Sequence, residues 1–343
     1  MNKQYITIIL LLFICAILSF SLISKDSNSV SLECDGDGAA NYVVTDFDEL
    51  NYKDFFDVSD FGENSLSNID IASKSYTNNS ITILDSSFKM SDELVNNINN
   101  TINSYGSSSS FYIVSLDDGM SIGYNIDKKF ETASSIKAPY ALYIYKEIDA
   151  GNIDPNQQII YQEKYYNKGT GVIKKSDFGT SYTVRDLVYY SLFESDNIAH
   201  TMLHRTFGVK GYNNMLKNLG TKQLYLTAGN PWGYTSARSA ALVWQEIYNF
   251  SITSDEGITF LNILSNGKYN YFKEVMPSIP SASKTGFASK DVVETGIVFG
   301  EHPYIAIAIA NKGGNIGAYT QVLKLVSHMN DIMNEYDNYL KAK

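Results

Sequence analysis

The sequence predicts an α+β fold with a five-stranded antiparallel sheet, flanking helices and a mostly helical inserted subdomain. The first observation is a hairpin pattern at 110–126, where two β-rich runs are joined at Asp117-Asp118-Gly119. The second is a long, mostly helical stretch that begins at residue 134. The third is the return of strand patterns after it, at 281–288, 292–300 and 304–311. Two strands, a helical block and three more strands favour one antiparallel sheet split by an insertion.

The remaining elements and the domain boundaries follow from the same patterns. Amphipathic helices are predicted at 90–106 and at 318–336, so they flank the strands in the sequence. We therefore predict an N-terminal membrane anchor or signal segment, an acidic and largely irregular stalk, and a catalytic domain with a helical insertion. The anchor or signal segment is predicted at 1–25, the stalk at 26–88 and the catalytic domain at 89–343, with its helical insertion at about 134–275. The stalk allows one short strand at 80–84.

The negative charge of the 343-residue chain is local. Its net charge is −10, yet residues 26–88 alone carry thirteen acidic residues against two lysines. The predicted catalytic domain is therefore close to neutral, and nothing in its charge indicates nucleic-acid binding. The only cysteines are Cys15 and Cys34, so the catalytic domain contains no disulfide.

The N-terminus predicts an extracytoplasmic location. Residues 5–23 are mostly apolar, which is long enough to cross a bilayer and longer than the apolar region of most cleaved signals. Lys3 precedes this segment and acidic residues follow it, which favours a catalytic domain outside the cytoplasm. We expect a single-pass membrane protein, or a secreted one if the segment is cleaved.

The stretch ETASSIKAPYALYIYKEIDAG, residues 131–151, contains the first candidate site. Ser134 precedes Lys137 by one helical turn at the start of an apolar helix. The pair can be a simple helix cap, or a nucleophile with its proton acceptor. The S-x-x-K pattern occurs four times in the chain, but only the Ser134 copy opens a strong helix after a hairpin.

Two further motifs decide between these interpretations. Ser195-Asp196-Asn197 lies within FESDNIAH, and Lys284-Thr285-Gly286 lies on a predicted strand. The order S-x-x-K, S-D-N, K-T-G is typical of penicillin-recognising serine enzymes. From about residue 89 to 340 the chain resembles the class A β-lactamases and the related D,D-peptidases of cell-wall synthesis.

The residue types suit acyl transfer. Ser134 Oγ needs a base, and Lys137 can serve if burial and the nearby cation of Lys284 lower its pKa. The resemblance implies that Ser195 relays a proton to the leaving group and that Asn197 binds the substrate amide. It also implies that Lys284 and Thr285 hold the substrate carboxylate. The backbone N–H groups of Ser134 and of Phe287, which follows Gly286, would form the oxyanion hole. Asp196 is expected to be a structural hydrogen-bonding residue.

One expected group is missing. Class A β-lactamases carry a Glu between the second and third motifs that activates the deacylating water, but residues 197–245 contain no Asp or Glu. We therefore expect slow deacylation, because ester hydrolysis needs a positioned base. This favours a D,D-peptidase-like or β-lactam-binding protein. A divergent β-lactamase that uses Lys137 in both steps remains open, as does a non-catalytic, membrane-tethered sensor of β-lactams or wall peptides.

Other motifs carry no function in this interpretation. GMSIG at 119–123 matches the nucleophile elbow G-x-S-x-G but lies inside the predicted hairpin. His200 and His204 are four residues apart, but the Glu of H-E-x-x-H is absent. We expect no metal and no cofactor. The expected partners are a β-lactam or a peptidoglycan stem peptide, and the membrane through the N-terminal segment.

Overall fold

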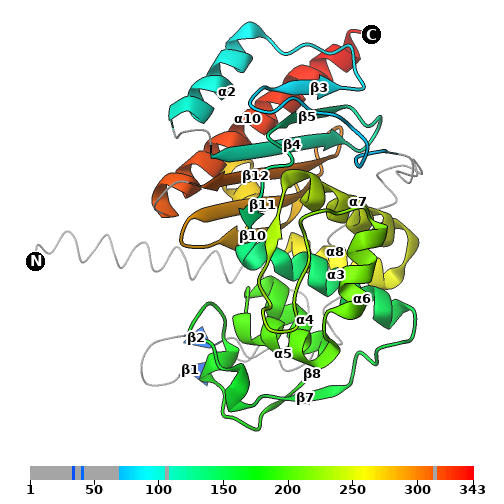
Figure 1. Cartoon of the computed structure of the whole chain (residues 1–343), viewed down its shortest axis with the longest axis vertical. Helices are drawn as coiled ribbons and strands as arrows, with labels where there is room; N and C mark the ends of the chain where they lie inside the picture. Colours follow the sequence, from blue (N-terminus) through cyan, green and yellow to red (C-terminus); the bar gives the residue numbers. More distant parts are fainter. Residues whose placement is uncertain (1–32, 35–39, 42–68, 105–107, 312–314) are drawn as a thin grey trace, which may run out of the picture. The chain divides into compact units, whose positions relative to one another are not determined.

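The computed structural model describes residues 33–34, 40–41, 69–104, 108–311 and 315–343 (Figure 1). The chain divides into two compact units, residues 1–52 and 53–343. Of the first unit the structure describes one antiparallel pair, β1 (Glu33–Cys34) and β2 (Ala40–Asn41). The predicted membrane segment and most of the predicted stalk lie outside the described residues. None of the helices within the described ranges is both long and apolar enough to cross a bilayer.

The second unit is built on a six-stranded antiparallel sheet. Its spatial order is β10-β11-β12-β4-β5-β3. The strands are β3 (Thr82–Leu84), β4 (Ser109–Ser115), β5 (Ser121–Tyr124), β10 (Ser281–Phe287), β11 (Asp291–Val298) and β12 (Tyr304–Asn311). The last three strands of the chain therefore lie beside the first hairpin, which confirms a sheet interrupted by an insertion.

The prediction of five strands was one too few. β3 adds the sixth by pairing with β5, with Ile83 opposite Ile122. It has three residues, all of them half-buried, and it lies at the edge of the sheet. It lies within the short strand predicted at 80–84, but that strand was assigned to the stalk. Three residues carry no signal for a partner, so only the pairing with β5 shows that the segment belongs to the sheet.

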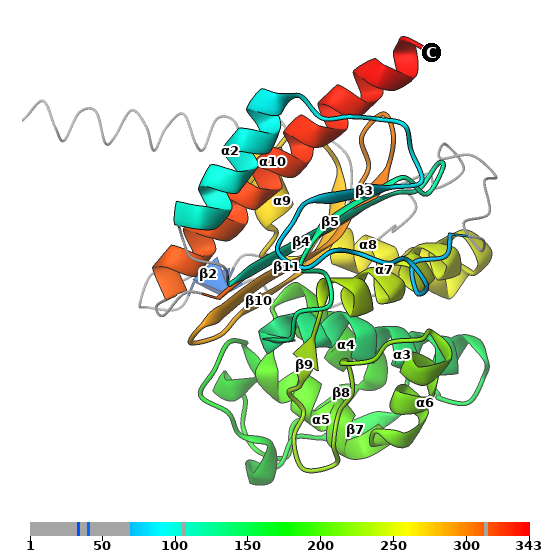
Figure 2. The same ribbon diagram turned by 45° about the horizontal axis from the view of Figure 1, so that its top comes forward.

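Helices cover both faces of this sheet (Figures 1 and 2). On one face lie α2 (Asp92–Ser104), α9 (Tyr271–Val275) and α10 (Asn315–Lys341). On the other lie α7 (Ala237–Thr253) and α8 (Asp255–Ser265). The apolar residues of α10, such as Leu325 and Met329, pack with those of the sheet into the main core. Burial of this surface is the main source of the fold's stability.

The helical insertion follows β6 (Phe130–Glu131). Apart from α7 and α8, its helices lie on the side of these two helices that faces away from the sheet (Figure 2). Its first elements are the 3-10 turn η5 (Ala133–Ile136), α3 (Lys137–Asp149), α4 (Val184–Phe193), α5 (Asn197–Phe207) and α6 (Lys210–Asn218). Short pieces complete it: β7 (Gln158–Ile160), η6 (Glu163–Tyr165), η7 (Ile173–Lys175), β8 (Ser181–Thr183) and β9 (Tyr234–Thr235). The predicted mostly helical character of this stretch is confirmed.

Side-chain caps fix where the helices around the site begin. Thr183 and Asp186 form a reciprocal capping box at the start of α4, and Ser236 caps α7. Asp196 caps α5 by accepting hydrogen bonds from two backbone N–H groups of its first turn. α4 therefore ends just before the S-D-N motif, and α5 begins within it.

Candidate active site

Ser134 lies in η5, a turn held between the sheet and a short strand pair. Just before the turn, β6 pairs with β9, with Phe130 opposite Thr235 and Glu131 opposite Tyr234. Within the turn Ser135 Oγ donates a 2.7 Å hydrogen bond to the carbonyl of Thr132. Because η5 leads directly into the buried helix α3, the position of Ser134 is set by the packing of that helix.

Gly286 allows the third motif to lie against this turn. A Cβ at this position would be 2.4 Å from the carbonyl oxygen of Thr132 and 3.0 Å from the backbone nitrogen of Ser135. Both neighbours are backbone atoms, so a side chain would push β10 away from the turn that holds Ser134. The glycine of K-T-G is therefore required by the close approach of two backbones.

The Nζ atom of Lys137 lies at the centre of the site. The residue is 0% exposed. Nζ lies 2.6 Å from the carbonyl oxygen of Ser195, 2.7 Å from Asn197 Oδ1 and 2.9 Å from Ser134 Oγ. A carbonyl and an amide oxygen only accept hydrogen bonds, so they take two N–H groups. In a neutral amine this leaves the lone pair directed at Ser134 Oγ, which then donates its proton.

Ser195 connects the two lysines. Its Oγ lies 3.3 Å from Lys137 Nζ and 3.1 Å from Lys284 Nζ. Ser195 has a positive φ of 54°, a conformation that costs energy for a residue with a side chain. The turn between α4 and α5 thus presents both the carbonyl and the hydroxyl of Ser195 to Lys137.

The surroundings lower the pKa of both lysines. Burial lowers the pKa of Lys137 well below its usual value and the charge of Lys284 lowers it further, whereas Asp196 has an opposing effect. Burial lowers the pKa of Lys284 to about 8, with Glu294 opposing the shift. Lys284 therefore keeps most of its charge at neutral pH, whereas burial and this neighbouring charge favour the neutral form of Lys137.

Asp196 is a structural residue. Its Oδ1 accepts hydrogen bonds from the backbone of Ile198 and Ala199, and its Oδ2 accepts from Val172 and Ile173. With four N–H donors the carboxylate has no free lone pair for chemistry. It instead fixes the start of α5, and with it Asn197, against the start of η7.

The remaining predicted residues lie beside this network. Asn197 Nδ2 is 3.5 Å from Asn167 Oδ1, and the backbone N–H of Asn197 donates to the carbonyl of Thr170. Thr285 is buried in β10, one residue beyond Lys284. Phe287 ends β10 and is 49% exposed. The acceptor role of Asn197 toward Lys137 orients its NH₂ group away from the lysine.

An open cleft of about 400 Å³ lies in front of Ser134, which is large enough for a small molecule or a peptide end. Residues from five segments of the chain, three of them aromatic, form its walls. The lining residues are Glu131, Ala133, Ser134, Thr170, Asn197, Asn230, Trp232, Gly233, Tyr234, Phe287 and Ala288. Among the described residues that line it, Glu131 is the only acid.

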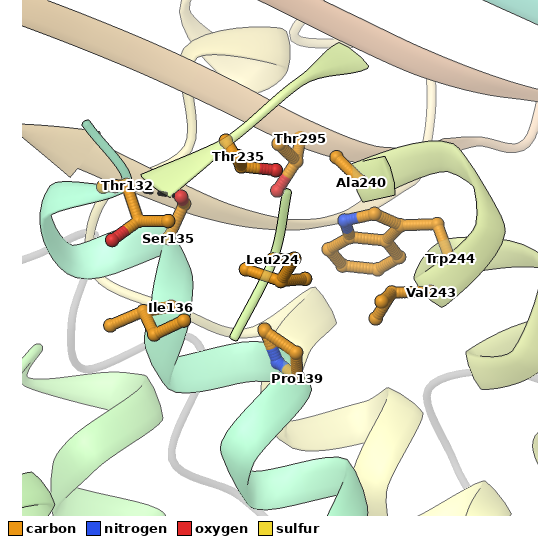
Figure 3. Close-up of a pocket in the computed structure, with 10 residues that line it drawn as sticks. All are labelled: Thr132, Ser135, Ile136, Pro139, Leu224, Thr235, Ala240, Val243, Trp244 and Thr295. Atoms are coloured by element: carbon orange, nitrogen blue, oxygen red, sulfur yellow. Dashed lines mark hydrogen bonds between the residues drawn. The ribbon is translucent and has the colours of Figure 1, made fainter. Parts of the chain in front are cut away.

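A second, much smaller cavity lies behind η5, between this turn, α7 and the sheet (Figure 3). Its volume is about 10 Å³, the space of roughly one water molecule. Thr132, Ser135 and Thr295 contribute hydroxyl groups, while Leu224 and Trp244 close it on the apolar side. It is far too small for a substrate, so the chemistry belongs to the open cleft.

The loop before β9 belongs to the segment 197–245, which contains no Asp or Glu. Trp232 on this loop lies with its ring centroid 5.4 Å from Lys137 Nζ, and Asn230 lines the cleft. Acids near the motifs point elsewhere: Glu194 forms an ion pair with Lys268 at 3.1 Å. Glu294 lies opposite Thr285 in the β10–β11 register; it is fully buried and does not line the cleft.

Side chains of helix α5 bind the backbone of this loop. His200 Nε2 lies 2.9 Å from the carbonyl oxygen of Pro231, and His204 Nε2 lies 3.0 Å from that of Thr227. Arg205 donates to the carbonyls of Ala228 and Gly229 at 2.6 and 3.3 Å. The two histidines thus bind loop carbonyls, and in the part of the chain that is described no cluster of His, Cys, Asp and Glu could hold a metal.

The rival nucleophile also has a structural role. Ser121, the central serine of GMSIG, is buried in β5. Its Oγ accepts hydrogen bonds from Lys74 Nζ at 3.0 Å and from the Tyr76 hydroxyl at 2.8 Å. A strand serine with this burial has no access to a substrate, so the match to the nucleophile-elbow pattern is coincidental.

The fold and the arrangement of the three motifs define a class, the serine β-lactamase and transpeptidase superfamily. The model of the beta-lactamase enzyme family matches residues 93–335, and the chain belongs to that family. The resemblance indicated by the three motifs is thereby confirmed. No curated protein sequence matches the chain significantly.

Solved structures of low sequence identity share the fold. A β-lactamase from Sphaerobacter thermophilus is 21% identical with a TM-score of 0.61, over 69% of this chain and 94% of its own. A point mutant of PBP-A is 20% identical with a TM-score of 0.63, over 70% and 97%. An ancestral class A β-lactamase is 17% identical with a TM-score of 0.62, over 70% and 99%.

The structure brings five of the predicted site residues into one hydrogen-bonded network: Ser134, Lys137, Ser195, Asn197 and Lys284. Thr285, Gly286 and Phe287 follow on β10, and the roles assigned to all eight residues stay predictions. The sequence-based interpretation missed Trp232 and Glu131 as cleft residues. The turn-forming pair Asn230-Pro231 before Trp232 indicates a loop, but nothing local says that the loop reaches Lys137.

We expect Arg205→Ala to loosen the loop that carries Trp232 without unfolding the protein. Arg205 is exposed, so the free energy of unfolding should change by no more than about 1 kcal/mol. Acrylamide quenching should rise for Trp232, while Trp244 is 1% exposed and contributes little. Lys217→Ala, which removes an exposed cation from α6, is the control. Unchanged quenching in Arg205→Ala would show that the arginine does not hold the loop.

Proposed function

We propose that the protein is an extracytoplasmic serine acyltransferase or hydrolase that forms an acyl ester at Ser134 with β-lactams or D-alanyl-D-alanine peptides. The observation that carries this proposal is the surrounding of Lys137 Nζ. Two acceptor oxygens at 2.6 and 2.7 Å occupy its N–H groups, and Ser134 Oγ lies at 2.9 Å on the remaining side. A buried neutral amine placed in this way is a base for one hydroxyl.

In the proposed acylation, the proton of Ser134 passes by way of Lys137 and Ser195 to the leaving group. Ser134 Oγ attacks the acyl carbon and forms the new C–O bond, while its proton moves to the lone pair of Lys137 Nζ. When the tetrahedral intermediate collapses, the C–N bond breaks. The proton then passes from Lys137 through Ser195 Oγ, 3.3 Å away, to the leaving nitrogen. The backbone N–H groups of Ser134 and Phe287 stabilise the oxyanion in this scheme.

Substrate binding uses the charges beside this network. Lys284 keeps its charge below its pKa of about 8 and lies next to Ser195, so it is positioned for a substrate carboxylate. Thr285 provides a hydroxyl and Asn197 an amide for the same ligand. Both β-lactams and a D-alanyl-D-alanine end present a carboxylate and an amide. One fold neighbour, the point mutant of PBP-A, is an acyl-enzyme complex with penicillin G.

We further propose that the acyl ester is released slowly. The loop over Lys137 contributes Asn230 and Trp232 to the cleft and β9 contributes Tyr234, and none of the three carries a carboxylate. The carboxylate of Asp196 is saturated with four hydrogen bonds, and Glu194 is paired with Lys268. Glu131 is exposed at the rim, and among the described contacts its carboxylate makes no hydrogen bond to Ser134 or Lys137.

Replacing Ser134 with Ala should abolish covalent labelling by benzylpenicillin. Intact-protein mass spectrometry should show a stoichiometric adduct on the native chain and none on Ser134→Ala. Lys137→Met should slow the labelling by about a hundredfold or more, because a general base contributes at least that factor. Ser121→Ala, at the buried rival serine, serves as the comparison for loss of a hydroxyl. Labelling of Ser134→Ala at the native rate would refute the proposal.

The adduct should persist for minutes or longer after excess benzylpenicillin is removed. Asn230→Asp adds a carboxylate to the cleft at constant size and keeps the oxygen that accepts the 3.0 Å hydrogen bond from the backbone N–H of Trp232. We expect it to shorten the adduct lifetime by about tenfold or more, since it supplies the class of base that is missing. Asn230→Ala is the matched control. Loss of the native adduct within seconds would instead identify an efficient β-lactamase.

A further inference from the structure

Two charged residues lie on different sides of Ser134: Glu131 lines the cleft, and the buried Lys284 lies beside Ser195. Lys284 lies in the middle of β10, and its Nζ points to Ser195 on one side of Ser134. The strand ends at Phe287, three residues further, or about 10 Å along an extended chain. The backbone N–H of Glu131 donates a 2.7 Å hydrogen bond to Asp291 Oδ2, just past the β10–β11 turn. Glu131 therefore lies at the Phe287 end, away from Lys284.

The backbone of Glu131 is fixed while its side chain is open to solvent. β6 pairs with β9, so Glu131 lies opposite Tyr234, and both residues line the cleft. Asp291 is buried, and its carboxylate binds the backbone of Glu131 and the side chain of Asn311. Asp291 is thereby not available to a ligand. Glu131 remains as the carboxylate that a molecule bound at Ser134 would meet.

Glu131 has no ion-pair partner among the residues that the structure describes. Among the ion pairs within 4.0 Å in the described part of the chain, none includes Glu131. The neighbouring cation, Lys129, has its Nζ 4.0 Å from the ring centroid of Tyr234. The rim already accommodates one ammonium group against an aromatic face in this way. Tyr234 and Phe287 are 43% and 49% exposed, so their rings are open to a ligand.

We propose that Glu131 selects acyl donors that carry a primary ammonium group on their acyl side chain. The inference rests on the proposed function, in which Lys284 holds the carboxylate on the leaving-group side. The donor is then zwitterionic, with its carboxylate at Lys284 and its ammonium at Glu131. A peptide with a free side-chain amine fits this description, as does an amino-substituted penicillin. The aromatic rings of Trp232, Tyr234 and Phe287 provide the apolar walls between the two charges.

The test compares two acyl donors that differ only in this amine, ampicillin and benzylpenicillin. Both acylation rate constants are measured with the full chain at about pH 6, below the pKa of an α-amino group. We expect the native chain to favour ampicillin, and Glu131→Gln to lower the ampicillin-to-benzylpenicillin ratio by about three- to fivefold, the range of one exposed ion pair. A ratio cancels any general effect of the substitution on the cleft.

Two variants control for charge. Lys129→Gln removes the competing cation and should raise the ratio, whereas Glu93→Gln, on α2 across the sheet, should leave it unchanged. Added salt should reduce the preference of the native chain. An unchanged ratio in Glu131→Gln would overturn this inference while leaving the acylation proposal intact. Failure of both penicillins to label Ser134 in the native chain would overturn the proposed function itself.

Discussion

The site depends on one unfavourable placement, the burial of the Lys137 amine among neutral groups. Its near neighbours are the carbonyl of Ser195, the amide of Asn197 and the hydroxyl of Ser134, none of which carries a charge. Because Lys284 lies across Ser195, a second positive charge at Lys137 would be repelled as well as poorly solvated. The surroundings thus disfavour the protonated amine, and the neutral amine is the form that can accept a proton.

This arrangement costs stability, and the surrounding fold maintains it. The pKa of Lys137 in the folded protein is lower than in the unfolded chain, where it is about 10.4. Between these two pKa values the unfolded chain binds more protons than the folded protein. The free energy of unfolding therefore rises with pH in this range. Ser195 adds backbone strain through its positive φ of 54°. The four hydrogen bonds to Asp196 and the packing of α3, α4 and α5 hold these groups in place. The apolar core around α10 supplies the stability that such a site requires.

The sequence predicts those features that have a local cause. The hairpin, the three late strands and α10 carry clear periodicities, and the three motifs identify the superfamily because each combines distinctive residues with a structural context. The edge strand β3 lies within the short strand expected at 80–84, but only its pairing with β5 shows that it belongs to the sheet. Trp232 and Glu131 were missed for the same reason. Their places in the cleft follow from the β6–β9 pairing and from the bonds of His200, His204 and Arg205 to loop carbonyls. These contacts join residues too distant in sequence for a local pattern to connect.

The most direct measurement is the titration of Lys137 in the folded protein, by ¹³C NMR of lysine side chains. Lys137→Arg, which removes one signal, would assign the resonance. A neutral Lys137 should show the Cε resonance of an uncharged amine at neutral pH. This amine should become protonated only as the pH falls. A titration near the ordinary lysine pKa of about 10.4 would contradict the account, because Lys137 could then not accept the proton of Ser134.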